Sequence, residues 1–428
     1  MSVQQVSPGV LRFEDARRVV EAQAATVRAP GAESVDLLSA AGRVLAEAVL
    51  ADRNFPPFPR STRDGYAVRS ADLSSTPATL DVIGEIKAGE KPDKIPTHVA
   101  RGQAIAIMTG APVPAGADAV VMVEYTSPRG IRVEISRSVA GGENIVPEGA
   151  EAQAGSALIT GGTRLNDAAI ALAAAAGNSR LQVYRRPRVA VLTTGDEIVD
   201  VSATPGPTQI RNSNSYSLAA QIRNAGGEPV LLPIAPDESQ ALRLLIEQGL
   251  HCDLLLMTGG VSMGRYDLVE QVLAELNAEF FFTGAQIQPG RPAVFGKCGA
   301  DLTPATCESA SAPAKPSTYF FGLPGNPVST MVTFELFARP MLDALAGQSP
   351  RPLMFLHAKL KSEIRTKPGL TRFLPAMLSG EFQNSQVELI PWQGSGDVAA
   401  TARANCYIVV APDRDRIAAG EFVPTLPR

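Results

Sequence analysis

Apolar and polar positions form two different patterns along the chain, and the first pattern extends over residues 188–347. Near-continuous apolar runs alternate there with segments whose apolar residues recur three or four positions apart. Such runs are typical of strands buried on both faces of a parallel sheet, and such segments predict the helices that cover it. We expect strands at residues 188–199, 228–234 and 252–260, and helices at 213–227, 237–249 and 266–276.

The second pattern consists of short apolar runs separated by glycine and proline, which predicts small strands. It fills residues 54–145 and returns in residues 351–428. In the later segment, strands are expected at 372–378, 386–392 and 406–412. Each of the two segments therefore predicts a β-rich domain.

Helical patterns flank the first of these β-rich segments. Residues 13–27 are amphipathic, and residues 168–177 are apolar enough to predict a buried helix. We therefore predict a multidomain protein of the α/β plus β class, whose central α/β domain holds a mostly parallel sheet. The expected domains are an N-terminal helical or linker domain at 1–53 and 146–184, an inserted β-rich domain at 54–145, an α/β domain at 185–347 and a C-terminal β domain at 351–428.

Composition narrows the class of protein. The 428 residues carry a net charge of −4, which gives no sign of nucleic-acid binding. No apolar run reaches the ~18 residues of a membrane span, and the amino terminus lacks the pattern of a signal peptide. The four cysteines form no CxxC pair, and the three histidines show no zinc spacing. We expect a cytoplasmic protein, in which residues 301–318, poor in large apolar side chains, are a disordered surface insertion between two strands.

The loops that follow the expected strands carry the candidate chemistry. A Pro-Gly-Asn-Pro stretch at residues 324–327 stands where an apolar run gives way to a helical pattern. Proline has a fixed φ and no N–H, while glycine and asparagine tolerate positive φ, so this loop has a defined shape. In an open α/β sheet the loops at the carboxyl ends of the strands share one rim, where ligands bind. The glycine-rich loop at 258–262 is expected on the same rim.

Four acidic residues are expected on that rim as well, namely Asp196, Glu197, Asp237 and Asp267. Glycine-rich turns let backbone N–H groups approach an anion, whereas carboxylates repel one unless a divalent cation lies between them. Because Mg²⁺ prefers oxygen ligands, the combination predicts a magnesium-dependent site for a phosphoester or phosphoanhydride. Structural roles compete with this interpretation; Asp237, for example, is also placed to cap the helix expected at 237–249.

Short motifs in a fixed order give the chain a family resemblance. They read GRVLAEAV at 42–49, RDGYAV at 63–68, IMTGAPVPAGADAVV at 107–121, TTGDEI at 193–198, TGGVSMGRYD at 258–267, PGRPAVFGK at 289–297, GLPGNPVS at 322–329 and QGSGD at 393–397. The ordered set resembles the MoeA family of molybdopterin molybdenumtransferases over nearly the whole chain. The resemblance implies a homodimer that inserts molybdenum from molybdate into adenylylated molybdopterin, with Mg²⁺ and release of AMP.

The resemblance also implies roles for individual residues. Asp64 and Thr109 would be contributed by the partner chain, and Glu197, Asp237 and Asp267 would hold Mg²⁺ or position the anhydride. The α/β domain at 185–347 would bind molybdopterin. The expected contacts are Gly259, Gly260 and Ser262 to phosphate, Pro324, Gly325, Asn326 and Pro327 to the pterin nucleotide, and Gln288, Arg291, Pro292, Arg372 and Ser395 to molybdate.

The chain departs from the family pattern around the expected molybdate site. Gln288 and Arg291 stand where the family commonly has two lysines, so one positive charge is missing at Gln288. Arg372 takes the place of an arginine that the family has at a neighbouring position. Arg63 and Arg265 replace an uncharged and an acidic residue, and both add positive charge near the pocket.

Two other functions stay open at this point. One is an adenylyltransferase that acts one step earlier, since single-domain proteins of that activity share the α/β motifs. The other is a non-enzymatic scaffold, since a eukaryotic relative of the family clusters receptors. The inserted and C-terminal domains favour molybdenum transfer, because adenylylation needs neither. A separate molybdopterin adenylyltransferase is a candidate partner, and neither nucleic acid nor a membrane is expected as one.

Overall fold

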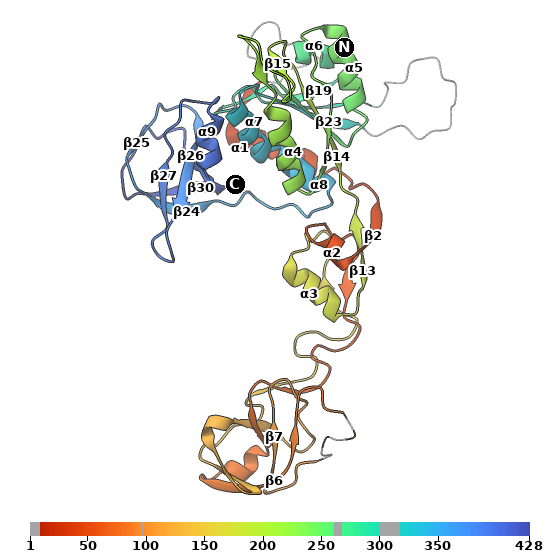
Figure 1. The fold of residues 1–428 in the computed structure, drawn as a ribbon, viewed down its shortest axis with the longest axis vertical. Coiled ribbons are helices and arrows are strands. Elements are labelled where there is room, and N and C mark those ends of the chain that lie inside the picture. Colours follow the sequence, from red (N-terminus) through yellow and green to blue (C-terminus); the bar gives the residue numbers. More distant parts are fainter. Residues whose placement is uncertain (1–8, 92, 94, 96–97, 261–267, 300–316) are drawn as a thin grey trace, which may run out of the picture.

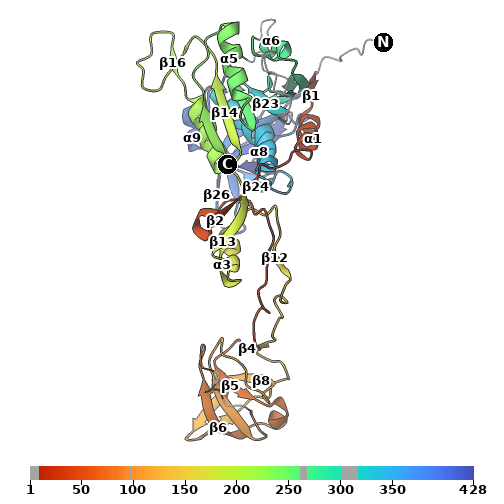
Figure 2. The ribbon, with the colours of Figure 1, turned by 90° about the vertical axis from the view of Figure 1, so that its right-hand side faces the viewer.

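The computed structural model describes residues 9–91, 93, 95, 98–260, 268–299 and 317–428. The chain is elongated, with an α/β body and a small barrel at one end, a slim middle body, and a β domain at the other end (Figure 1). A view turned by 90° shows the same order along the long axis (Figure 2). Among the described residues, no helix is both long and apolar enough to cross a bilayer.

A six-stranded mixed sheet forms the centre of the α/β body, in the order β17-β14-β18-β23-β22-β19. The first four strands run parallel; β22 is antiparallel to β23, and β19 is antiparallel to β22. The elements of this body are β14 (Arg188–Thr193), β15 (Ile198–Val199), β16 (Ile210–Arg211), α4 (Asn214–Asn224), β17 (Glu228–Leu231), α5 (Ser239–Gly249), β18 (Leu254–Thr258), α6 (Leu268–Glu275), β19 (Glu279–Phe282), β22 (Val294–Cys298), β23 (Thr318–Leu323), α7 (Pro327–Thr333), the π-helix η4 (Phe334–Ala338) and α8 (Arg339–Leu345).

Helices cover both faces of this sheet. Leu242 of α5 and Val272 of α6 belong to the core on one face, and Leu218 of α4 and Val328 of α7 belong to the core on the other. Of the strands between them, β18 is buried throughout and β14 is buried after Arg188, as the near-continuous runs predicted, whereas the edge strand β17 is partly exposed. The expected disordered insertion at 301–318 falls between β22 and β23, and all but its last two residues lie outside the described residues.

The amino-terminal helix, α1 (Phe13–Ala24), packs on the α/β body and not on the middle body. Its buried residues Ala16 and Val20 join the same core as α7 and α8, and the ring of Phe13 lies 6.3 Å from that of Phe337. This corrects the expectation that the helix belongs with the rest of residues 1–53, because its apolar face is covered by a part of the chain some 300 positions away.

The middle body is less helical than its sequence suggested. It consists of β2 (Ala32–Asp36), α2 (Leu37–Ala40), β3 (Val49–Leu50), β12 (Ala157–Ile159), α3 (Asp167–Ala175) and β13 (Arg180–Tyr184). The helix predicted at 168–177 is present as α3, but the expectation that it is buried is wrong, since Ala173 is the buried residue of α3 and most of the others are exposed. The physical reason is that this small body covers α3 from one side, through α2 and β12.

The inserted β domain is built on a six-stranded sheet in the order β8-β5-β7-β6-β10-β9. Its strands are β5 (Gly65–Val68), β6 (Ala78–Ile86), β7 (Gln103–Ile107), β8 (Ala119–Met122), β9 (Thr126–Arg129) and β10 (Arg132–Ile135), with short helical turns at Ser70–Leu73 and Val123–Tyr125. The chain enters through β4 (Arg60–Ser61) and leaves through β11 (Ile145–Val146), which pair with each other. Apart from Val146 of β11, all of these strands lie within the segment that was expected to be β-rich.

The carboxyl-terminal region is a closed barrel of five strands. The order β26-β27-β24-β30-β28 closes through the pairing of β26 with β28. The elements are β24 (Leu356–Leu360), β25 (Ile364–Arg365), β26 (Thr371–Ser379), β27 (Gln386–Leu389), α9 (Val398–Arg403), β28 (Cys406–Val410), β29 (Arg416–Ile417) and β30 (Phe422–Pro427). Three short strands complete the chain, namely β1 (Val10–Leu11), β20 (Gly284–Ala285) and β21 (Ile287–Gln288), and β21 joins the barrel through β26.

Candidate functional site

Three of the expected loops, those after β14, β18 and β23, begin at neighbouring register positions on the carboxyl edge of the α/β sheet. The pairing register sets Thr193 of β14 beside Thr258 of β18, and Thr258 beside Leu323 of β23. Since parallel strands point the same way, the loops that follow these residues leave the sheet side by side. The rim that the sequence predicted is therefore present.

A cavity of about 360 Å³ opens between these loops; we call it the rim cavity. Its lining includes residues 211–214, which lead from β16 into the first residue of α4, and the threonines at 193, 194 and 258. It also includes six of the predicted site residues, namely Glu197, Gly259, Gly260, Gly325, Asn326 and Pro327.

The loops touch closely at Gly259. This residue has a φ of 87°, and a Cβ there would lie 2.4 Å from the carbonyl oxygen of Thr194. A Cβ on Gly325 would lie 3.5 Å from the Cα of Gly259. The contact therefore requires glycine at position 259 for both conformation and space.

A buried hydrogen-bond network lies beneath the Pro-Gly-Asn-Pro loop. Asn214 Nδ2 donates to Thr258 Oγ1 at 2.9 Å and to the Gly325 carbonyl at 2.7 Å. Thr258 Oγ1 donates to the Pro324 carbonyl at 3.1 Å, which also accepts from Thr330 Oγ1 at 2.5 Å. The sequence did not single out Asn214, because an asparagine directly before an amphipathic pattern indicates a helix cap. The N-cap residue of α4 is instead Ser213, which makes no side-chain cap bond, and the preceding Asn212 accepts from Ser215 N–H through its Oδ1.

The acidic residues of the rim are only partly brought together. The Glu197 side chain lies over Gly195, where a Cβ would fall 2.5 Å from Oε2. Asp237 lies outside the lining of the rim cavity, and its N–H donates to Asp196 Oδ1 at 3.1 Å. The alternative that Asp237 caps the next helix does not hold, since α5 has Glu238 at its N-cap and no side-chain cap bond. Within the described ranges, no group of three or more His, Cys, Asp or Glu residues is arranged to hold a metal ion.

Two predicted residues, Ser262 and Asp267, lie outside the described residues. Their expected roles therefore stay predictions. The same holds for Arg265, one of the departures from the family pattern.

The residues expected at molybdate form a second group around α7. Gln288 and Arg372 are register partners in the pairing of β21 with β26. The Ser395 carbonyl accepts from Val328 N–H, in the first turn of α7, at 3.0 Å. Arg291 is exposed, and it and Pro292 follow a glycine that packs against the same helix. Gln288, Arg291, Pro292, Arg372 and Ser395 do not contribute to the lining of the rim cavity.

Arg372 is held partly inside the protein. Its Nη2 donates to the Lys367 carbonyl at 2.5 Å, while its Nε is buried and without a partner in the described structure. Burial lowers the pKa of this guanidinium from its ordinary value. An arginine in such surroundings has an N–H left to donate to an anion.

Asp64 and Thr109 contact each other on the inserted β domain. Asp64 Oδ1 accepts from Thr109 N–H at 2.6 Å and from Thr109 Oγ1 at 2.8 Å. These two bonds hold the pKa of the Asp64 carboxyl below its ordinary value, and the backbone bond contributes most. The domain that carries β5, which follows Asp64, lies at the opposite end of the molecule from β14 and β23 (Figure 2).

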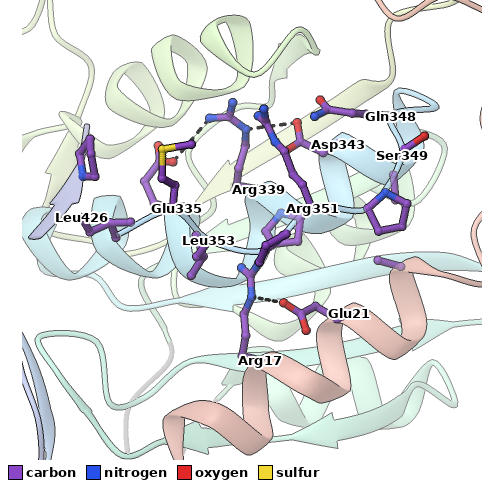
Figure 3. Close-up of a pocket in the computed structure, with 17 residues that line it drawn as sticks. Arg17, Glu21, Glu335, Arg339, Asp343, Gln348, Ser349, Arg351, Leu353 and Leu426 are labelled. Atoms are coloured by element: carbon purple, nitrogen blue, oxygen red, sulfur yellow. Dashed lines mark hydrogen bonds and ion pairs between the residues drawn. The ribbon is translucent and has the colours of Figure 1, made fainter. Parts of the chain in front are cut away.

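A second cavity, of about 320 Å³, holds none of the predicted site residues. It lies between α1, η4, α8, residues 348–354 and the end of β30 (Figure 3). Arg17 of α1 donates to Glu21 Oε1 at 2.7 Å, and burial lowers the pKa of its guanidinium. Because the three arginines that line this cavity pair with its own carboxylates, we assign it to the packing between these elements.

Comparisons with known families match the chain in three consecutive parts. Residues 11–177 match the family described as MoeA N-terminal region (domain I and II). Residues 190–344 match a probable molybdopterin binding domain, and residues 357–427 match the MoeA C-terminal region (domain IV).

Individual relatives are similar over comparable lengths. A molybdopterin molybdenumtransferase of Nostoc sp. is 40% identical over 320 residues, which are 74% of this chain and 70% of the relative. Molybdopterin molybdenumtransferase 1 of Mycobacterium tuberculosis is 32% identical over 435 residues, which are 95% of this chain and 98% of the relative. The crystal structure of a molybdopterin biosynthesis MoeA protein from Pyrococcus horikoshii covers 98% of this chain and 99% of its own, at 31% identity and a TM-score of 0.69.

Proposed function

Since this chain belongs to the MoeA family, as the resemblance of its motifs indicated, we propose that it inserts molybdenum from molybdate into adenylylated molybdopterin and releases AMP. The chain is a transferase of that family, whose curated members have a role in molybdenum cofactor biosynthesis. The rim cavity supports the proposed reaction, because the glycine-rich loop, the Pro-Gly-Asn-Pro loop and Glu197 all line this one cavity.

The rim cavity suits the pterin nucleotide in size and lining. Its volume of about 360 Å³ falls within the range of small-molecule pockets, roughly 300–1,000 Å³. Gly259 and Gly260 have φ values of 87° and 62° and carry no side chain, so a phosphate can approach their backbone. Ser262 would act in the same loop, and the prolines of the Pro-Gly-Asn-Pro loop would keep its shape.

Glu197 is the described residue best placed to hold Mg²⁺. Its exposed carboxylate lines the rim cavity, and oxygen is the donor that this ion prefers. Asp237 and Asp267 would complete the acidic group, with the remaining ligands coming from substrate phosphate and water. When bound, the ion would offset the negative charge of the anhydride.

We place molybdate at the second group of residues, around α7. Arg291 and Arg372 would donate N–H groups to the oxyanion, and the unpaired Nε of Arg372 is one such donor. Gln288 is the register partner of Arg372, and Ser395 is held beside α7 by its carbonyl. The first turn of α7 would therefore border both the pterin-nucleotide site and the molybdate site.

A direct assay tests the reaction. Purified protein with adenylylated molybdopterin, molybdate and Mg²⁺ should release AMP. Arg291→Ala should raise the molybdate concentration for half-maximal rate at least about tenfold, since one charge-assisted contact is worth roughly 1.5–3 kcal/mol. Gln288→Lys should lower it, and Arg351→Ala, an exposed arginine of the other cavity, is the control. In a parallel assay with molybdopterin and ATP, formation of adenylylated pterin would instead favour the adenylyltransferase, and turnover in neither assay would favour the scaffold.

We further propose a homodimer with sites shared between chains. The support is geometric, because Asp64, which Thr109 contacts, directly precedes β5, and the domain of β5 lies at the opposite end of the molecule from β14, the strand that leads into the loop with Glu197 (Figure 2). Mixing inactive Asp64→Ala chains with inactive Glu197→Ala chains should restore about a quarter of the activity, since half of the dimers are mixed and each has one intact site. If exchanged dimers stay inactive, the sites are not shared.

A further inference from the structure

The rim cavity contains a buried asparagine to which the proposed reaction assigns no role. Asn214 is the first residue of α4, is 8% exposed and lines the cavity. Its Nδ2 bonds to Thr258 and Gly325 connect three elements, namely the first turn of α4, the end of β18 and the Pro-Gly-Asn-Pro loop. Since these elements come from distant parts of the chain, one amide group sets how they lie relative to one another.

The partners of Asn214 allow one orientation of its amide. The Gly325 carbonyl accepts hydrogen bonds and cannot donate one, so Nδ2 must face it. Thr258 Oγ1 accepts from the same Nδ2, which leaves the hydroxyl hydrogen for the Pro324 carbonyl 3.1 Å away. A carboxylate of the same shape at position 214 would supply neither bond, because an ionised aspartate has no N–H.

Two polar side-chain atoms in the lining of the rim cavity have no hydrogen-bond partner among the described residues. Asn214 Oδ1 and Thr194 Oγ1 are buried and have no partner in the described part of the chain, and both residues line the rim cavity. Buried polar atoms of folded proteins nearly always pair, so these two indicate where donors of a ligand would be received. The Asn214 Oδ1 atom would repel a phosphate oxygen, which points to the pterin or sugar part of the nucleotide.

We propose that Asn214 is a positioning residue of this site. It holds the Pro-Gly-Asn-Pro loop through Nδ2 and orients an N–H or O–H donor of the bound pterin nucleotide through Oδ1. The second role rests on the proposed function, whereas the first concerns the loop itself. The two therefore need separate measurements.

Hydrogen–deuterium exchange of Asn214→Asp tests the first role. The loop is reported by the amides of Val328 and Thr330, which donate to the carbonyls of Ser395 and Asn326 at 3.0 Å each. Peptides over residues 323–333 should exchange at least about tenfold faster in the variant, which corresponds to about 1.4 kcal/mol. Unchanged exchange of these peptides would overturn the loop role, whatever the reaction of the protein is.

A matched control and a second pair of variants keep this test specific. Asn178 Nδ2 also donates to two backbone carbonyls, those of Ala173 and Ala176, but in the middle body. Asn178→Asp should leave exchange at 323–333 unchanged, and an equal increase would contradict the proposal.

Should Asn214→Asp fail to fold, Thr258→Val removes the same hydrogen-bond network, and Thr258→Ser retains the hydroxyl at position 258. The valine variant should loosen the loop and the serine variant should not.

Kinetics with adenylylated molybdopterin test the second role. Asn214→Leu, which removes Oδ1, should raise KM for this substrate about tenfold or more and should change kcat much less. Thr194→Val, which removes the other unpaired atom, should raise KM in the same direction. An unchanged KM in both variants would overturn the substrate role, while an absence of AMP release from the wild-type protein would reject the proposed function and leave the loop result standing.

Discussion

At the scale of single residues, Thr109 donates two hydrogen bonds to the Asp64 carboxylate, although 45 positions separate the two residues in the chain. Folding lowers the pKa of this carboxyl through the backbone and the hydroxyl of Thr109. A group of this kind stabilises the folded state above its unfolded pKa, and that contribution is lost as the pH falls through the folded pKa. Asp64 is therefore a fixed negative charge near neutral pH and does not act there as a proton donor.

Removal of the Thr109 hydroxyl should make this carboxyl easier to protonate. In Thr109→Val, the pKa of Asp64 should rise toward its ordinary value of 3.8 without reaching it, because the backbone bond, the larger cause, remains. Carboxyl titration by NMR measures the change. Thr62→Val is the control, since the Thr62 hydroxyl donates to the Asn144 carbonyl and not to Asp64. An equal shift in both variants would show that the hydroxyl contact is not its cause.

At the scale of elements, α7 is where the two halves of the candidate site meet. Its amino-terminal end follows the Pro-Gly-Asn-Pro loop, and its first turn bonds to the Ser395 carbonyl. On its other side the chain comes so close at Gly290 that a Cβ would lie 2.5 Å from Thr333 Cγ2. The backbone of Gly290 has a φ of 107°, which disfavours any other residue there.

Gly290→Ala should therefore destabilise the protein and displace the neighbouring arginine at 291. We expect a loss of roughly 1–3 kcal/mol in the free energy of unfolding, from overpacking and backbone strain together. Chemical denaturation followed by tryptophan fluorescence measures it. Gly299→Ala is the matched control, because among the described residues no atom lies within 4 Å of a Cβ at that position. Equal free energies of unfolding for the two variants would show that α7 accommodates the added methyl group without loss of stability.

The elements also show how far sequence reasoning extends. The buried strands β14 and β18 and the loops after them were predictable, because apolar runs and glycine or proline positions are local signals. The role of Asn214 was not, since its partners Thr258 and Gly325 become neighbours only through the strand order. The same reason hid the packing of α1, whose apolar face matched the middle body and the α/β body equally well on its sequence.

At the scale of the whole molecule, one arginine joins the middle body to the α/β body. The Arg164 guanidinium donates to the carbonyls of Gly42 and Ala225 at 2.9 Å each, to Asp343 Oδ1 at 3.1 Å and to Gln348 Oε1 at 2.9 Å. Burial lowers its pKa, and Asp343 opposes that effect. Arg164 thus fixes the middle body, which leads to the inserted β domain, to the α/β body.

Arg164→Ala should weaken this junction. Removal of one partner of a fully buried ion pair costs about 3–5 kcal/mol; the loss here should fall at or below the lower end of that range, because the Arg164–Asp343 pair is only partly buried and Arg339 also pairs with Asp343. Arg351→Ala removes a largely exposed arginine 4.0 Å from the same carboxylate, and should cost no more than about 1 kcal/mol. Thermal unfolding compares the two, and similar losses would show that the junction does not depend on Arg164.

The pairing of β4 with β11 has a consequence for how such a chain can change over evolution. The path into the inserted domain and the path out of it run together, through Arg60 opposite Val146 and Phe55 opposite Ala152. Because these ends are already adjacent, a short turn could join them with little loss of chain entropy. The inserted domain is thus a cassette, which a single recombination event could add, delete or exchange while the path of the remaining chain stays the same.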